Sequence, residues 1–226
     1  TVNSLINSAH HLKKRFEKLT IKFTILDVNS PETHIEKMLT KFNKEGFEVD
    51  HFPVKIDKNF KDNMSTTMAS IKHSFNLAKN CKDLINFVED DYVHKNEALT
   101  EMLFSYETFC SIHQNEIFIL SSDYPYLYKK MNSSNILIGE NTHWRTVKES
   151  LLTFMTSKKM VEKYFDKLID MTTRQSDPFE KNLHEIYEQE KCLSPIPSLS
   201  VHCTNINSVF GISPNLNVKK IWDENK

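Results

Sequence analysis

The segment LINFVEDDY, residues 84–92, governs the interpretation of this chain. Its first five residues are apolar or amide side chains rich in strand formers, and they predict a buried strand. Three carboxylates follow at once: Glu89, Asp90 and Asp91. Ligands of open α/β sheets bind at the carboxyl ends of strands, so these acids stand where function is expected. Adjacent carboxylates are tolerated when water or a cation neutralises them, and such oxygen donors suit Mg²⁺ or Mn²⁺. A solvated acidic turn is the alternative interpretation.

An earlier segment ends in the same way. The run IKFTILD, residues 21–27, predicts a strand that closes on Asp27. The following Ser30-Pro31-Glu32 is typical of a helix start, and Gly46 is typical of that helix's end. Two parallel strands that each end in acid would direct both groups into one crevice, beside a helix N-terminus that favours an anion. Alternatively, Asp27 and Ser30 simply cap the turn and the helix.

The alternation of strand, helix, strand, helix and strand over residues 21–88 predicts the α/β class. We expect a single domain with a mostly parallel central sheet flanked by helices. Further helices are expected at residues 2–19, 98–109, 158–170 and 178–190, and further strands at 47–54, 116–120, 136–138 and 199–202. No linker divides the 226 residues.

Composition excludes several functional classes. The chain has only three glycines, Gly46, Gly139 and Gly211, which lie too far apart for a GxGxxG, GxxxxGK[ST] or GxSxG motif. Its four cysteines form no CxxC pair, so neither a zinc ribbon nor a thioredoxin-type site is indicated. The formal net charge of −1 gives no reason to expect a nucleic-acid partner. No apolar run approaches the roughly 18 residues of a transmembrane segment, and no signal peptide is evident, so we expect a cytoplasmic protein.

The order of ILDVNSP, an amphipathic helix and INFVEDDY resembles the nucleotide-sugar half of GT-A glycosyltransferases, particularly those of family 2. The resemblance implies a GT-A fold in which Asp27, Glu89 and Asp90 bind the nucleotide-sugar. Glu89-Asp90-Asp91 would match the D-x-D motif of that family, with Glu89 replacing its first aspartate. Asp91 would then be a ligand of the metal ion, Mn²⁺ or Mg²⁺.

The resemblance continues downstream. Ser176-Asp177-Pro178 resembles the acidic base motif of the family, which makes Asp177 the candidate general base, with Glu180 and Glu185 as nearby substitutes. The segment SLSVH, residues 198–202, resembles the late strand whose histidine completes the metal site, so His202 is the second candidate metal ligand. In the alternative interpretation Asp177 caps a helix and His202 is an ordinary surface or core residue.

Between these motifs lies a polar stretch, residues 139–145, that we predict to be a loop. In it, Trp144 could stack on an acceptor sugar and Arg145 could clamp a phosphate or carboxylate. Alternatively, Trp144 seals the edge of a core. The resemblance divides the domain into a nucleotide-sugar half (1–110), an acceptor half (111–205) and a C-terminal tail (206–226). It also leads us to expect that the family's first strand precedes residue 1 and is missing from this sequence.

The sequence thus predicts an inverting, metal-dependent glycosyltransferase. Its partners would be a nucleotide-sugar donor, with UDP- or GDP-sugars favoured, and a saccharide or other hydroxyl acceptor. One alternative is a phosphatase of the haloacid-dehalogenase type, although Asp27-Val28-Asn29 offers no second acid for that chemistry. Another is a sugar- or nucleotide-binding module without catalysis. The donor sugar, the acceptor and the oligomeric state are left open.

Overall fold

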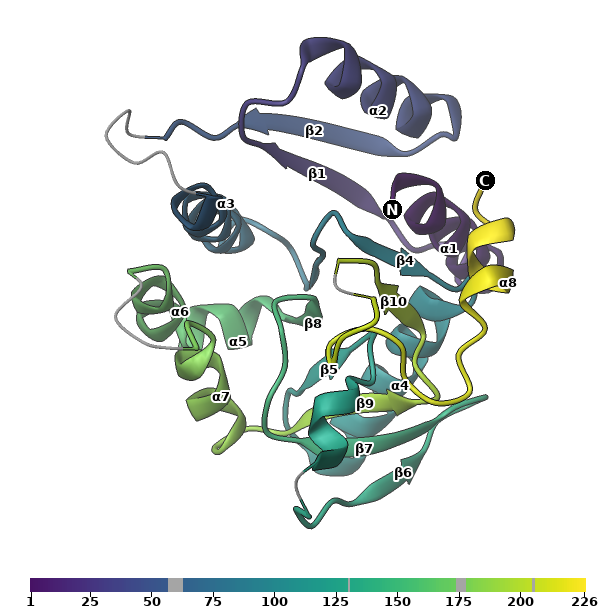
Figure 1. The fold of residues 1–226 in the computed structure, drawn as a ribbon, viewed down its shortest axis with the longest axis vertical. Helices are drawn as coiled ribbons and strands as arrows, with labels where there is room; N and C mark the ends of the chain where they lie inside the picture. The colour runs from purple at the N-terminus through teal and green to yellow at the C-terminus, as the bar shows by residue number, and fades with distance from the viewer. Residues whose placement is uncertain (57–62, 130, 174–177, 205) are drawn as a thin grey trace.

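The computed structural model describes residues 1–56, 63–129, 131–173, 178–204 and 206–226 (Figure 1). Its helices are α1 (Val2–Arg15), α2 (Glu32–Lys44), α3 (Asn63–Ala78), α4 (Ala98–His113), the 3₁₀ helix η1 (Pro125–Lys129), α5 (Lys158–Lys163), α6 (Phe165–Met171), α7 (Lys181–Tyr187) and α8 (Val218–Asp223). Its strands are β1 (Lys22–Asp27), β2 (Glu48–Pro53), β3 (Leu84–Phe87), β4 (Tyr92–His94), β5 (Phe118–Leu120), β6 (Ile136–Ile138), β7 (His143–Val147), β8 (Phe154–Ser157), β9 (Cys192–Ile196) and β10 (Ser200–His202).

The helix with the clearest sequence signals is confirmed. α2 begins at Glu32, directly after a proline whose fixed φ suits a helix start. Its apolar face is buried through Ile35 and Phe42. Gly46 has a φ of +76°, the left-handed conformation that glycine adopts without steric cost after a helix. The predicted strand at 136–138 is likewise confirmed as β6.

The strands form three sheets. The largest has six strands in the order β3-β8-β5-β9-β7-β6, in which β5 and β9 run parallel and the other neighbours run antiparallel. β1 and β2 form a separate parallel pair, and β4 and β10 form a separate antiparallel pair. Figure 1 shows β1, β2 and α2 at one end of the molecule and the six-stranded sheet with most of the helices towards the other.

The prediction of a mostly parallel central sheet of the GT-A type is therefore wrong. The parallel pairing holds for β1 and β2, but β3 pairs antiparallel with β8 instead of extending that pair. Among the described strands of the six-stranded sheet, only β5 and β9 are parallel neighbours, and the other pairs are antiparallel, some of them across short connections. β6 and β7, for example, are joined by the short turn 139–142, which permits only antiparallel pairing. The alternation of strands and helices over residues 21–88 does not extend to the rest of the chain.

Three further boundaries differ from the predictions. The expected loop at 139–145 contains strand β7, which pairs with both β6 and β9. The expected helix at 158–170 is two helices, α5 and α6, which meet at Tyr164. The first helix ends at Arg15 instead of Leu19.

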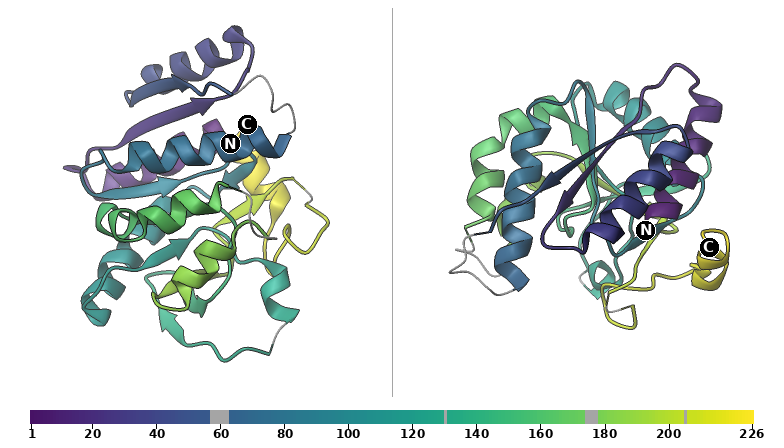
Figure 2. Two further views of the ribbon diagram at one scale, coloured as in Figure 1. Left: turned by 90° about the vertical axis from the view of Figure 1, so that its left-hand side faces the viewer. Right: turned by 90° about the horizontal axis from the view of Figure 1, so that it is seen from above.

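Helices cover both faces of the six-stranded sheet. Successive side chains of a strand point to opposite faces, and β5 shows the result. Ile119 packs in the core cluster that contains residues of α1 and α4. Phe118 and Leu120 pack in the second cluster, which contains residues of α3, α5, α6 and α7. Figure 2 shows α3, α5 and α6 gathered on one side of the molecule and α1 on the other. Burying each large apolar side chain contributes about 1.5–3 kcal/mol.

The two ends of the described chain lie side by side. The Asn7 side chain on α1 donates to the backbone carbonyl of Glu224 at 3.3 Å, and its bond to the side chain of Asn225 is 2.9 Å long. α8 therefore packs beside α1, as Figure 1 also shows. In the described ranges, none of the helices combines the length and apolar character that crossing a membrane requires.

Candidate functional site

Asp91 and His202, the two candidate metal ligands, lie in contact. His202 Nε2 is 2.8 Å from Asp91 Oδ2. The contact follows from the β4–β10 pairing, whose register places His202 opposite Tyr92, the residue after Asp91. The backbone N–H of Cys203 also donates to the Asp91 carbonyl at 2.8 Å. Two strands of three residues each thus join side chains that are 111 positions apart in the sequence.

Each partner of this pair stabilises the charged form of the other. Burial disfavours the Asp91 carboxylate, but hydrogen bonds from the side chains of His202 and Thr204, together with the charge of His202, lower the pKa of Asp91 below its ordinary value. Burial likewise disfavours the charged imidazole, but the hydrogen bond and charge of Asp91, with the charge of Glu89 and a backbone hydrogen bond at Phe210, together raise the pKa of His202. Asp91 Oδ1 is buried and has no hydrogen-bond partner among the described residues. The contact therefore favours the charged form of both side chains, and it leaves one carboxylate oxygen of Asp91 without a partner in the described chain.

Glu89 lies beside this pair in a much drier environment. Burial, and then the charge of Asp91, raise the pKa of Glu89 to about 7. The Thr153 hydroxyl contacts Glu89 twice: it accepts from the backbone N–H at 3.2 Å and donates to the carboxylate Oε2 at 3.3 Å. With a pKa of about 7, the Glu89 carboxyl is about half protonated near neutral pH, and a cation bound nearby would favour its ionised form.

A row of aromatic rings leads away from His202. The Tyr92 ring stacks on the imidazole with centroids 4.8 Å apart, and the Tyr92 hydroxyl bonds to the Tyr124 hydroxyl at 2.7 Å. The Tyr124 ring in turn stacks on Tyr126 at 5.8 Å. The buried Glu180 acts electrostatically on both Glu89 and Tyr126, so it lies near the acidic end and the aromatic end of the same site.

The other candidate residues of the nucleotide half have different surroundings. The Asp27 carboxylate accepts from the backbone N–H of Ser30 at 3.2 and 3.3 Å, which is the turn-capping role. Neither Asp91 nor His202 is among the partners recorded for Asp27 in the described part of the chain. Asp90 is exposed, and its backbone carbonyl accepts from the Thr1 hydroxyl.

Of the candidate bases, Glu180 is the one that the structure places near the acidic site. Asp177, the predicted base, lies outside the described residues. Glu185 is half exposed and its Oε2 forms an ion pair with Lys167 Nζ at 3.1 Å, so it belongs to the surface of α6 and α7.

The two candidate acceptor residues point to opposite faces of β7. Trp144 is fully buried in the core cluster with α4 residues, where its ring meets Phe109 edge-on at 6.5 Å. Trp144 thus has no exposed face for a sugar, and the alternative interpretation, in which it seals a core, describes its position. Arg145 lies on the other face of the strand and is 9% exposed.

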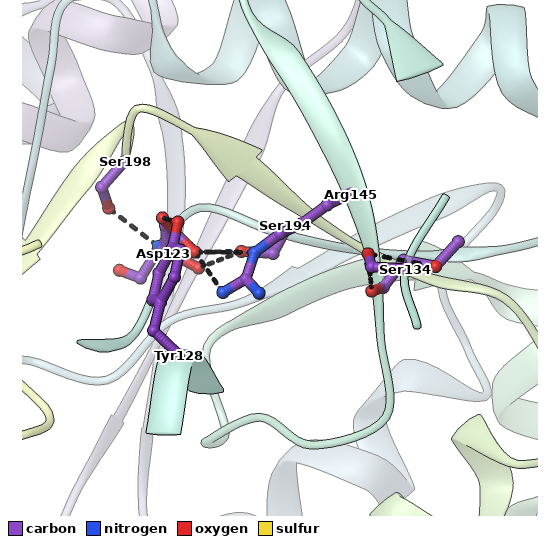
Figure 3. Close-up of polar contacts among 8 residues, drawn as sticks. Asp123, Tyr128, Ser134, Arg145, Ser194 and Ser198 are labelled. Atoms are coloured by element: carbon purple, nitrogen blue, oxygen red, sulfur yellow. Dashed lines mark hydrogen bonds and ion pairs between the residues drawn. The ribbon is translucent and has the colours of Figure 1, made fainter. Parts of the chain in front are cut away.

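Arg145 belongs to a buried polar network (Figure 3). Its Nε and Nη2 donate to Asp123 Oδ1 at 3.2 and 2.7 Å. The Ser194 hydroxyl donates to the same oxygen at 3.2 Å, and the Tyr128 hydroxyl donates to Oδ2. The backbone N–H of Asp123 donates to the Ser198 hydroxyl at 2.9 Å. Every polar group of Asp123 named here has a hydrogen-bond partner, which offsets the cost of burying this side chain.

Sequence reasoning missed Thr153, Asp123 and Tyr128. For Asp123 a signal was present, because the apolar strand EIFIL, residues 116–120, runs into Ser121-Ser122-Asp123 just as LINFV runs into its acids. Thr153 and Tyr128 carry no comparable signal, since a hydroxyl in a connection is common and its partner is fixed only by the fold.

Within the described ranges, no set of three or more His, Cys, Asp and Glu side chains is arranged so that it could hold a metal ion by itself. Asp91 could supply one ligand and His202 a second once its imidazole is neutral, because a protonated imidazole does not bind a metal ion. Any further ligands would have to come from water or substrate. No protein-family model matches this chain, and no curated protein matches it significantly.

Proposed function

We propose that this protein is a metal-dependent glycosyltransferase, which moves a sugar from a nucleoside-diphosphate donor to an acceptor hydroxyl. The observation that carries the proposal is the contact between Asp91 and His202, in which two strand ends bring together a carboxylate and an imidazole. Mixed oxygen and nitrogen donors suit Mn²⁺, and oxygen donors suit Mg²⁺.

The donor set fits a cation that is shared with a diphosphate. Asp91 Oδ1 is a buried oxygen without a partner in the described chain, and Glu89 is a neighbouring carboxyl that can ionise. Mg²⁺ and Mn²⁺ sites commonly use one or two protein carboxylates, with water and substrate phosphates as the remaining ligands. A cation held by Asp91 and His202 would neutralise the charge that develops on the departing diphosphate.

The acceptor hydroxyl must lose a proton as it attacks, and Glu180 is the described carboxylate that fits this role. It is buried and lies close enough to Glu89 to raise the pKa of that carboxyl. Asp177, three positions earlier, remains the base that the resemblance implies. Either residue would act by holding the hydroxyl and accepting its proton.

The experiment is turnover of a panel of UDP- and GDP-sugars with Mn²⁺ or Mg²⁺, measured as nucleoside diphosphate released. We expect turnover with at least one donor in the wild-type protein and loss of turnover in Asp91→Asn. Asp83→Asn is the matched control, because Asp83 is an exposed carboxylate at the other end of β3. Turnover in Asp91→Asn equal to that of the control would contradict the proposal.

A further inference from the structure

A cleft of about 450 Å³ opens beside the Asp123–Arg145 network. It lies between the 3₁₀ helix η1 and strand β7 on one side and the connection from α7 to β9 on the other. Its lining includes Tyr128, Asn132, Arg145, Lys148, Gln189 and Lys191. The volume falls within the range of roughly 300–1,000 Å³ that is usual for small-ligand pockets.

One wall of the cleft is held rigidly. The Arg145 guanidinium lies over the Tyr128 ring, with its carbon 4.1 Å from the ring centroid. The Asp123 carboxylate accepts hydrogen bonds from both side chains and holds them in place. The bonds to Asp123 use Nε and Nη2 of Arg145. Figure 3 shows the remaining guanidinium nitrogen pointing away from Asp123. A planar, preorganised donor of this kind can bond two neighbouring oxygens of a ligand.

The charges along the cleft balance. The basic residues Arg145, Lys148 and Lys191 are matched in number by the acidic Glu149, Glu188 and Glu190. Ion pairs compensate several of them: Arg145 pairs with Asp123, Lys148 with Glu188, and Glu190 with Lys163. A lining without net charge gives no preference for a phosphate or a carboxylate.

The uncharged lining residues are rich in hydrogen-bonding groups. Asn132, Ser133 and Gln189 are exposed amide and hydroxyl side chains, and Ser134 already donates to the Thr146 carbonyl at 2.7 Å. Amides, hydroxyls, a fixed guanidinium and an aromatic ring together match a ligand with many hydroxyl groups and no charge. That ligand class is carbohydrate.

The cleft also adjoins the acidic site. Burial raises the pKa of Tyr126, and the charges of Glu149 and Glu180 raise it further, so both acids lie near this ring. Glu149 lines the cleft, whereas Glu180 acts on Glu89. The aromatic row Tyr92, Tyr124 and Tyr126 runs from His202 to the residue before Leu127, which lines the cleft, so this row connects the acidic site with the cleft.

We infer that this cleft binds an uncharged saccharide of one or two rings, and that this saccharide is the acceptor. That the saccharide is the acceptor rests on the proposed glycosyl transfer. Saccharide binding itself depends on neither a donor nor a cation. The two ideas can therefore fail separately.

The test is saturation-transfer NMR of the wild-type protein in EDTA, without a nucleotide-sugar. The probes are a panel of neutral mono- to trisaccharides, an acidic panel of uronic acid and sialic acid oligosaccharides, and the nucleosides uridine and guanosine. We expect at least one neutral saccharide to bind, and the double variant Asn132→Ala/Gln189→Ala to weaken its affinity at least tenfold. Asn80→Ala, an exposed asparagine after α3, is the matched control and should bind as the wild type does.

Several outcomes would overturn the inference. These are no binding of any neutral saccharide, binding confined to acidic saccharides or to nucleosides, and binding that the double variant and the control affect equally. Circular dichroism of the three proteins shows whether they share one fold, and Tyr128→Phe, which keeps the ring, should retain more affinity than Tyr128→Ala. Nucleotide-sugar turnover without saccharide binding would remove this inference and leave the proposed function intact.

Discussion

Two ion pairs of this protein, Asp123–Arg145 and Asp91–His202, join side chains from different segments of the chain, and they differ in how completely their hydrogen-bonding groups are satisfied. Asp123 and Arg145 are buried, and three side chains donate to the Asp123 carboxylate. Asp91 and His202 are partly exposed, and Asp91 keeps one oxygen without a partner among the described residues. A saturated pair, in which every carboxylate oxygen has a hydrogen-bond partner, supports the structure, whereas an unsaturated pair has an oxygen that can bind a ligand. The first pair shapes the wall of the cleft and leaves one Arg145 nitrogen that does not bond to Asp123, and we propose that the second pair binds a cation.

The largest expected effect comes from breaking the saturated pair. Arg145→Met removes the charge while retaining most of the alkyl volume, and it leaves Asp123 buried without its ionic partner. We expect a loss of about 3–5 kcal/mol in the free energy of unfolding, measured with urea. Adding Asp123→Asn should recover more than half of the loss. A single variant within about 1 kcal/mol of the wild type would show that this pair is not structural.

His94 on β4 and His202 of the unsaturated pair should respond to pH with opposite signs, and the larger response belongs to His94. Burial lowers the pKa of His94 to about 4, and neither ring nitrogen has a partner in the described structure. The unfolded chain therefore binds the proton first as pH falls from 6.5. We expect His94 to cost about 3 kcal/mol of stability by pH 4. His94→Phe should remove this part of the pH dependence, and an unchanged slope would contradict the expectation.

A smaller effect is expected within the saturated network. Ser194→Ala deletes one of the donors to Asp123 Oδ1 but leaves both bonds from Arg145 in place. The expected loss is about 1 kcal/mol in urea unfolding. A loss as large as that of Arg145→Met would mean that the serine, and not the guanidinium, holds the carboxylate.

The smallest effect is the pH response of His202. Its pKa is raised in the folded protein, so its stabilisation is fully present below the unfolded pKa of about 6.5 and is lost as pH rises through the folded value. Because the pair is partly exposed, we expect a change below about 1 kcal/mol. The stability difference between the wild type and His202→Gln, followed from pH 6 to pH 9, should shrink. A constant difference would argue against the ion pair.

The sequence predicts single strands and helices better than it predicts their pairing. LINFV and the 136–138 strand were recognised because apolar runs between polar turns are local patterns. The antiparallel order of the central sheet was missed, because pairing depends on which apolar faces meet across long separations. β7 was missed for a related reason: Trp144 and Arg145 alternate between a core and a polar network, and the segment therefore reads as polar.

The candidate site was predicted in part. The resemblance assigned Asp91 and His202 to one metal site, and they lie in contact; the pairing of β4 and β10 that joins them could not be predicted, because these strands are too short to be paired from their sequences alone. The buried network around Asp123 depends on serines from β9 and from the turn before β10, and no local pattern of residues joins them.

The central claim is that Asp91 and His202 hold a divalent cation together with a nucleoside diphosphate. The most direct measurement is Mn²⁺ binding by electron paramagnetic resonance, in the presence of UDP or GDP, for the wild type, Asp91→Asn, His202→Gln and the exposed control Asp83→Asn. We predict that the wild type and the control bind Mn²⁺ equally, and that each site variant binds it at least tenfold more weakly. Equal Mn²⁺ affinity in all four proteins would contradict the claim.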